Sequence, residues 1–178
     1  RLTTAFTYDA SGNMLTRTQT DTTGGSTNGQ VRTLTYTYDA YGHVLTVTGP
    51  RTDVTQATTY TYTGNNLATV TDALGHVSTV TSYNNSGQPL SMTDASGVIT
   101  DFTYDIRNRL LTSGVHTTIG TATTTLTYDA AGNVTKINQP DNSYLAYTYD
   151  IAHRVTKVTD ALGNYINYTL DANGGITA

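Results

Sequence analysis

The residues that could support catalysis or metal binding in this chain are its aspartates and histidines. There are 13 aspartates and 4 histidines, while glutamate and cysteine are absent. Glycoside hydrolysis needs two carboxylates in unlike environments. Asp101 stands within a predicted strand, Asp21 and Asp53 lie in insertions, and the others take turn positions: Asp9, Asp39, Asp72, Asp94, Asp105, Asp129, Asp141, Asp150, Asp160 and Asp171. We therefore expect the aspartates to form turns and not a catalytic pair.

The four histidines are scattered along the chain. His43 and His76 follow turn glycines, His153 takes a turn position, and His116 lies in an insertion. No two have the spacing of zinc ligands, and neither a Gly-x-Ser-x-Gly segment nor a Ser/His/Asp set is recognisable. The Gly-Gly-x-Gly-x-Asp nonapeptide of calcium-binding β-rolls is missing as well. The sequence therefore predicts a segment that is not an enzyme, with no catalytic residue, cofactor or metal site.

The turn aspartates belong to a repeat that occurs about eight times. Tyr8-Asp9-Ala10-Ser11-Gly12 returns as Tyr38-Asp39-Ala40-Tyr41-Gly42 and as Tyr128-Asp129-Ala130-Ala131-Gly132, and weaker copies start at Tyr62, Tyr83, Tyr104, Tyr149 and Leu170. Most copies are 21 residues apart, a period typical of repeat architectures. We assign these structural repeat positions: Tyr8, Asp9, Gly12, Tyr38, Asp39, Gly42, Asp72, Gly75, Asp94, Gly97, Tyr104, Asp105, Tyr128, Asp129, Gly132, Tyr149, Asp150, Asp160 and Gly163.

Each unit has a second turn about half-way along, as in Thr71-Asp72-Ala73-Leu74-Gly75. Aspartate at the first turn position accepts bonds from the backbone that follows, and glycine at the fourth tolerates positive φ. Two turns leave two short strands per unit, which is a β-hairpin. Abundant Thr, Tyr and Val, with no Glu, favour strands over helices. The sequence therefore predicts an all-β fold, a repetitive antiparallel β-hairpin meander.

The strand that enters each Tyr-Asp turn alternates cleanly. Leu34, Tyr36 and Tyr38 fall on one face, and threonines fall on the other. We expect side-by-side hairpins to pack tyrosine over tyrosine in rows. In the strand that leaves the turn the apolar residues are three apart, as in Val44 and Val47. A β-bulge would reconcile this spacing with a strand.

Three connections are longer than the period allows. The extra residues lie around 20–30, 49–56 and 114–122, and all three replace the second turn of their unit. In a regular meander they would project from one edge of the sheet. Insertions are natural places for binding, although tolerated variation in length is the simpler interpretation.

Charge and composition exclude several functions. The net charge of -4 argues against nucleic-acid binding. No apolar run approaches the length of a membrane helix, and the first residues do not have the basic-then-apolar pattern of a leader, so we expect neither feature within these residues. The repeats start and stop without a recognisable cap, so we expect a fragment of a longer array over 1–178, because repeat arrays need protected ends.

The motif resembles a known family. Tyr-Asp-x-x-Gly followed by Asn-x-(Leu/Val)-Thr, as at Tyr8 to Thr16 and Tyr128 to Thr135, resembles the YD repeat of rearrangement-hotspot (Rhs) proteins. The segment from Tyr104 to Leu111 is similar to a variant with Asn108 in the usual place of glycine. The resemblance covers practically the whole chain. Two departures are the short turn after Tyr62, with Gly64, and the replacement of tyrosine by Leu170.

The resemblance implies a segment of a β-sheet shell that spirals into a hollow cocoon around a C-terminal toxin domain in a bacterial effector. It also implies that the partners are the remaining repeats and the toxin domain, with secretion-apparatus or chaperone proteins as further candidates, and no nucleic acid. The implied protein is made in the cytoplasm and then secreted or displayed on the cell surface. The Asp-Pro-rich cleavage signature of the family is absent from these residues.

An alternative is a cell-surface module that binds carbohydrate or protein, because tyrosine faces suit sugar stacking. The two interpretations differ in the rest of the gene. A shell needs many more repeats and a downstream toxin, whereas an adhesin needs an anchor and no cargo.

Overall fold

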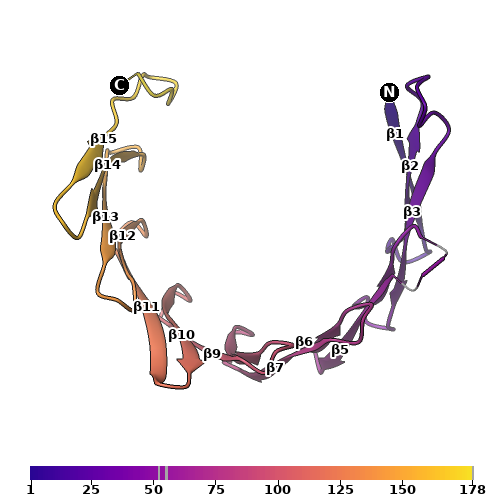
Figure 1. Cartoon of the computed structure of the whole chain (residues 1–178), viewed down its shortest axis with the longest axis horizontal. Coiled ribbons are helices and arrows are strands. Elements are labelled where there is room, and N and C mark those ends of the chain that lie inside the picture. The colour runs from indigo at the N-terminus through magenta and orange to yellow at the C-terminus, as the bar shows by residue number, and fades with distance from the viewer. Residues whose placement is uncertain (52, 55, 178) are drawn as a thin grey trace. The chain divides into compact units, whose positions relative to one another are not determined.

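The computed structural model describes residues 1–51, 53–54 and 56–177 of the chain. The described residues form fifteen β-strands, which follow one another in the sheet in chain order (Figure 1). The strands are β1 Leu2–Tyr8, β2 Met14–Asp21, β3 Val31–Tyr38, β4 Val44–Thr48, β5 Ala57–Thr63, β6 Asn66–Thr71, β7 Val77–Tyr83, β8 Pro89–Thr93, β9 Ile99–Tyr104, β10 Leu110–Thr117, β11 Gly120–Tyr128, β12 Val134–Asn138, β13 Tyr144–Tyr149, β14 Val155–Asp160 and β15 Tyr165–Asn167. The prediction of an all-β antiparallel meander is confirmed.

The chain divides into two compact units. The first consists of Arg1–Tyr83 and Thr93–Gly97, and the second of Asn84–Met92 and Val98–Ala178. In the first unit β1 to β7 pair in antiparallel fashion, each with the next. In the second unit β9 to β15 do the same. Both units are therefore built from hairpins that are neighbours in sequence.

A β-bulge follows the first residue of the strand that leaves a Tyr-Asp turn. In the hairpin of β3 and β4, Tyr38 is opposite Val44 and Thr37 is opposite Thr46, so Leu45 is the extra residue. The same shift occurs in the hairpins of β1–β2, β5–β6, β9–β10, β11–β12 and β13–β14. The bulge brings Val44 and Val47 to the same face, and the expectation of a bulge is confirmed.

The two faces of the hairpins differ in chemistry. The tyrosine face carries residues such as Tyr36 and Tyr38, and the threonine face carries the residues that alternate with them. On the threonine face the hydroxyls of Thr37 and Thr46 are 2.7 Å apart. Equivalent threonine pairs lie at the same distance in three other hairpins: Thr7 with Thr16, Thr61 with Thr69, and Thr103 with Thr112. Cross-strand pairs of this kind stabilise a sheet.

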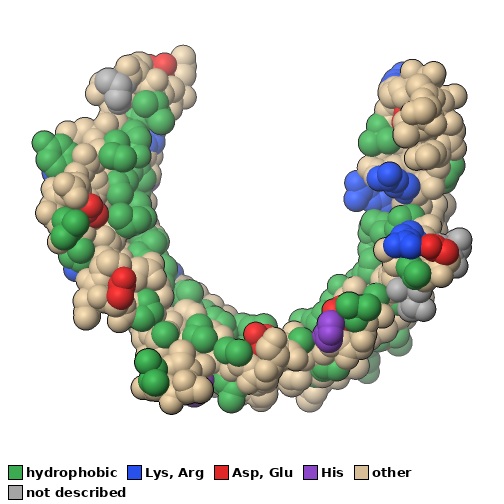
Figure 2. All heavy atoms as spheres, in the orientation of Figure 1, with side chains coloured by type: hydrophobic (Ala, Val, Ile, Leu, Met, Phe, Trp, Pro, Cys, Tyr) green, Lys and Arg blue, Asp and Glu red, His purple; other side chains and the backbone are tan. Residues whose placement is uncertain are grey.

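The described residues enclose no buried apolar core. Most strand side chains are half-buried, and hydrophobic side chains are visible on the surface of both units (Figure 2). The hairpins are therefore stabilised by backbone hydrogen bonds between paired strands and by side-chain contacts with adjacent strands. This is expected of a repeat protein in which each unit contacts only its neighbours.

The three insertions have different structures. Residues 22–30 form a loop between β2 and β3, which Asp21 N closes with a bond to Gln30 O (3.0 Å). Residues 49–56 connect β4 to β5, and positions 52 and 55 of this insertion lie outside the described residues. Residues 114–122 do not form a separate loop, because β10 and β11 continue through them as far as the pair of Thr117 and Gly120.

Candidate functional site: the row of Tyr-Asp turns

In each Tyr-Asp turn the aspartate carboxylate organises the backbone that follows it. Asp9 Oδ1 accepts the backbone N–H groups of Ser11 (2.9 Å) and Asn13 (2.8 Å). The same two bonds, to the second and fourth residues after the aspartate, recur in the Tyr-Asp turns of Asp39, Asp105 and Asp150, in the turn of Asp171, which follows Leu170, and in the half-way turns of Asp72 and Asp160. At Asp129 the donors are Gly132 and Asn133 instead. This is the local hydrogen bonding that makes aspartate a turn residue.

The fourth residue after the aspartate also contributes its side chain. Asn133 Nδ2 donates to Asp129 Oδ2 at 2.8 Å, and Arg109 Nε donates to Asp105 Oδ2 at 2.7 Å. His43 Nδ1 lies 2.8 Å from Asp39 Oδ2, and His76 has the same contact with Asp72. The Asn133 amide, more than any other donor, holds the pKa of Asp129 below its usual value of 3.8.

A left-handed residue completes each turn. Gly12 and Gly42 have φ of 87° and 85°. Asn108 and His153 take this place in their turns with φ of 62° each. Asparagine tolerates this region better than most residues, which explains why the Asn108 variant of the motif keeps the turn. The turn after Tyr62 is shorter, because Thr63 pairs directly with Asn66 around Gly64 and Asn65.

The motif tyrosines connect each hairpin to the one before it. The Tyr128 hydroxyl donates to the carbonyl oxygen of Leu110 (2.8 Å), and Leu110 is the first strand residue after the preceding Tyr-Asp turn. The same rule holds within each unit for Tyr38 and Met14, Tyr62 and Val44, Tyr104 and Pro89, and Tyr149 and Val134, at 2.7 to 3.0 Å. Tyr83 makes the equivalent bond to Leu67, the second residue of β6, at 2.5 Å. We call this series the tyrosine ladder.

The tyrosine ladder corrects the expected packing. No aromatic contact in the described ranges joins two tyrosine rings, so the prediction of tyrosine stacked on tyrosine is wrong. The long side chain spans the gap to the neighbouring hairpin, and its hydroxyl finds a backbone acceptor there. Sequence spacing could indicate the row but not the acceptor. Burial raises the pKa of Tyr62, Tyr83, Tyr104 and Tyr149 above 10.0.

Contacts also run forward, from one turn to the next. Arg109 Nη1 lies 3.3 Å from the carbonyl oxygen of Asp129, and its guanidinium stands over the Tyr128 ring at 4.3 Å. His43 stacks on Tyr62 at 4.6 Å between ring centroids. Arg154 Nη1 donates to the carbonyl oxygen of Asp171 at 2.9 Å. Neighbouring turns are therefore linked in both directions, backward by the motif tyrosine and forward by the residue that follows the left-handed position of the turn.

The structure brings together a serine, an aspartate and a histidine that the sequence analysis did not group. Asp101 on β9 accepts a hydrogen bond from Ser91 on β8 and lies 2.7 Å from His116 Nε2 on β10. The Ser91 hydroxyl, followed by His116, lowers the pKa of Asp101. The aspartate stands between the other two, so the imidazole has no contact that could activate the serine as a nucleophile.

The turn carboxylates are committed to structural hydrogen bonds. Within the parts of the chain that the structure describes, no group of three or more His, Cys, Asp or Glu residues could hold a metal ion. In the same ranges no helix is long and apolar enough to cross a membrane. What the arrangement can do is fix hairpins side by side in a defined register.

A regular row of Tyr-Asp turns on an antiparallel meander defines a YD-repeat sheet. A family model described as teneurin YD-shell matches residues 1–168, and the chain belongs to this family. The resemblance to YD-repeat proteins is thereby confirmed. A search among curated proteins gave no match.

Solved structures share the fold. A TcdB2-TccC3 structure that includes Cdc42 has a TM-score of 0.71 at 18% identity, and one of TcdB2-TccC3 has 0.71 at 20%; each match covers 96% of this chain. The Photorhabdus luminescens Tc holotoxin pore, with a mutated TccC3, has 0.70 at 19% identity over 98% of this chain. The chain spans 11% of the length of each of these proteins. At such identities the similarity shows the fold.

Proposed function

We propose that these residues form a stretch of wall in an Rhs-type shell that encloses a C-terminal toxin domain, and that the stretch performs no catalysis. The family assignment supports a shell segment. The observation that carries the proposal is the tyrosine ladder, because it attaches each hairpin to its predecessor without a buried core. A wall one sheet thick needs such bonds between hairpins, since each hairpin alone buries too little to be stable.

The same proposal covers the organisation of the protein. Residues 1–178 are one YD-repeat array within a longer shell, and their partners are the remaining repeats and the enclosed domain, with secretion-apparatus or chaperone proteins as further candidates. The protein is bacterial, made in the cytoplasm, and secreted or displayed at the surface. The turn aspartates have a structural role in the wall, because their oxygens accept hydrogen bonds from backbone and side-chain donors of their own turns.

Protease protection tests enclosure in the complete shell protein. One copy of a specific cleavage sequence is placed in the 22–30 loop, and a second is placed in the domain that follows the repeats. Enclosure predicts that the native protein is cut at the loop and protected at the second sequence, and that both are cut after unfolding. Rapid cleavage of both in the native protein would contradict enclosure and favour the open, surface-binding module.

A further inference from the structure

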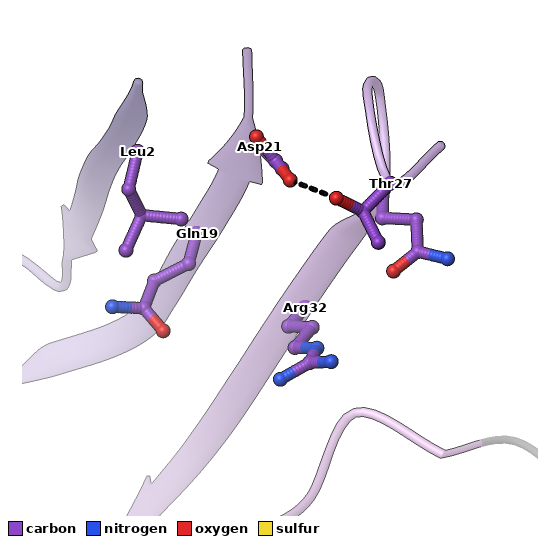
Figure 3. A pocket seen from close by; sticks show the side chains of 6 residues that line it. Leu2, Gln19, Asp21, Thr27 and Arg32 are labelled. Atoms are coloured by element: carbon purple, nitrogen blue, oxygen red, sulfur yellow. Dashed lines mark hydrogen bonds between the residues drawn. The ribbon is translucent and has the colours of Figure 1, made fainter. Parts of the chain in front are cut away.

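A pocket of about 240 Å³ lies beside the 22–30 loop, on the tyrosine face of β1, β2 and β3. Its walls come from Leu2, Gln19, Asp21, Thr27, Gln30 and Arg32. Figure 3 shows Leu2 on β1, Gln19 and Asp21 on β2, and Arg32 on β3. The volume is below the usual range for drug-sized ligands, which is about 300–1,000 Å³, so an occupant must be small.

Two opposite charges face this pocket without pairing. Gln19 is opposite Arg32, so Asp21 and Arg32 are diagonal neighbours on adjacent strands, a relation that separates Cβ atoms by roughly 7–8 Å. Among the described residues the ion pairs do not include Arg32 or Asp21. The guanidinium is therefore available as a planar donor, the geometry that suits a carboxylate.

The Asp21 carboxylate is fixed at the other end of the pocket. Thr27 donates its hydroxyl to Asp21 Oδ2, drawn as a dashed line in Figure 3, and Thr23 N donates to Oδ1 at 2.9 Å. These bonds, with that of Thr27 first, hold the pKa of Asp21 below its usual value. The Thr23 hydroxyl is a third donor to this carboxylate, so one of its roughly four acceptor positions remains open. Asp21 is therefore an ionised and oriented acceptor at neutral pH.

The two charges together select the class of ligand. A simple anion bound to Arg32 would be repelled by Asp21, and a simple cation bound to Asp21 would be repelled by Arg32. A ligand that carries both charges close together is attracted at both ends. The side-chain amides of Gln19 and Gln30 add donors and acceptors, and Leu2, which is 60% exposed, offers an apolar wall.

We propose that this pocket binds a small apolar α-amino acid as a zwitterion, with its carboxylate on the Arg32 guanidinium and its ammonium group on the Asp21 carboxylate. The short side chain of the ligand covers Leu2. This function is separate from the wall, because the ladder and the Tyr-Asp turns do not use these six residues.

Titration of the 178-residue chain with L-valine, followed by the NMR signals of the Gln19 and Gln30 side-chain amides, tests the proposal. Isovalerate is valine without its ammonium group and keeps the carboxylate alone, and isobutylamine is valine without its carboxylate and keeps the ammonium alone. We expect valine to shift both amide signals, and each single-charge probe to bind about tenfold more weakly or worse, because a hydrogen bond to a charged group is lost. Isovalerate or inorganic phosphate binding as tightly as valine would overturn the proposal, as would the absence of shifts with valine.

A matched pair of arginine variants supplies the control. Arg17 is opposite Leu34, and Leu34 is two residues from Arg32 on β3, so Arg17 shares the face without lining the pocket. Arg32→Gln should weaken valine binding about tenfold or more, whereas Arg17→Gln should leave it unchanged at the same net charge. Thermal melts of both variants check folding. Equal affinities of the two folded variants would refute the role of Arg32.

Discussion

The Tyr128 hydroxyl bonds to a backbone carbonyl oxygen in the preceding hairpin, and five other motif tyrosines do the same. Asp129, the next residue, bonds within its own turn. The tyrosine of the Tyr-Asp motif therefore connects two hairpins, whereas the aspartate stabilises the turn of its own hairpin. Because the tasks are separate, substitutions of the two residues should have separable effects.

Removal of one ladder hydroxyl should cost a measurable amount of stability. Tyr128→Phe keeps the ring and leaves the carbonyl oxygen of Leu110 without its donor, so we expect the free energy of unfolding to fall by about 1 kcal/mol. Urea denaturation measures the change. Tyr8→Phe is the control, because the described residues give the Tyr8 hydroxyl no hydrogen bond, and it should change stability by less than about 0.5 kcal/mol. Equal losses in the two variants would refute the ladder.

Leu170 offers the reverse experiment. Tyr149 reaches the carbonyl oxygen of Val134 from 15 residues downstream, and Leu170 stands in the same relation to Val155. Leu170→Tyr should therefore add a ladder bond and raise the free energy of unfolding by about 0.5–1 kcal/mol. Leu170→Phe, which adds the ring without the hydroxyl, separates the bond from the packing. If both variants are equally stable, the added hydroxyl makes no bond.

Acid should loosen the turns. The pKa values of Asp9, Asp129 and Asp160 are lowered in the folded chain, in each case most by the side-chain amide of the asparagine four residues on. A lowered folded pKa contributes stability that is complete above the usual value of 3.8 and is lost as the pH falls through the shifted values. Urea midpoints should therefore be flat at mildly acidic pH and fall below 3.8. An Asp129→Asn variant should lose less stability in acid than the parent chain does.

At the scale of elements, hairpins and their turns were predictable because their signals are local. Asp-x-x-Gly spacing identified the turns, and the apolar spacing after the turn indicated the bulge that the register at Val44 and Val47 confirms. The acceptor of each tyrosine hydroxyl was not predictable, since it lies 15 to 24 residues away on another hairpin. The contacts of Asp101 with Ser91 and His116 were not predictable for the same reason, because the three residues lie on three different strands.

Left-handed turn positions should be sensitive to a Cβ atom even in open space. Gly163 has φ of 85° and no atom within 4 Å of an added Cβ, so the cost of Gly163→Ala is that of backbone strain, about 1–2 kcal/mol. Gly25 lies outside the positive-φ region and has its nearest atom, Thr23 Oγ1, at 3.9 Å. Gly25→Ala should therefore be close to neutral. Thermal melts of the two variants compare them, and equal stabilities would contradict the turn geometry.

At the scale of the molecule, each unit is a single sheet layer with no buried apolar core among the described residues. In place of a core, each sheet is stabilised by backbone hydrogen bonds between strands, by the threonine pairs and by the tyrosine ladder. Such a sheet is suited to separating two spaces, because one face can be turned toward each of them. A shell wall in this sense is a sheet with one face toward the enclosed space and the other toward the outside. The shell assignment can therefore be tested by comparing the two faces.

The most direct test is the chemical accessibility of those faces in the complete shell protein. These residues include no cysteine, so single cysteines can be introduced on β13 at Leu145, on the tyrosine face, and at Thr148, on the threonine face. The wall predicts that both positions react with a bulky polyethylene-glycol maleimide in the 178-residue chain. In the complete protein one face should react and the other should be protected until the shell is unfolded. Equal, rapid reaction of both cysteines in the native complete protein would contradict an enclosing wall.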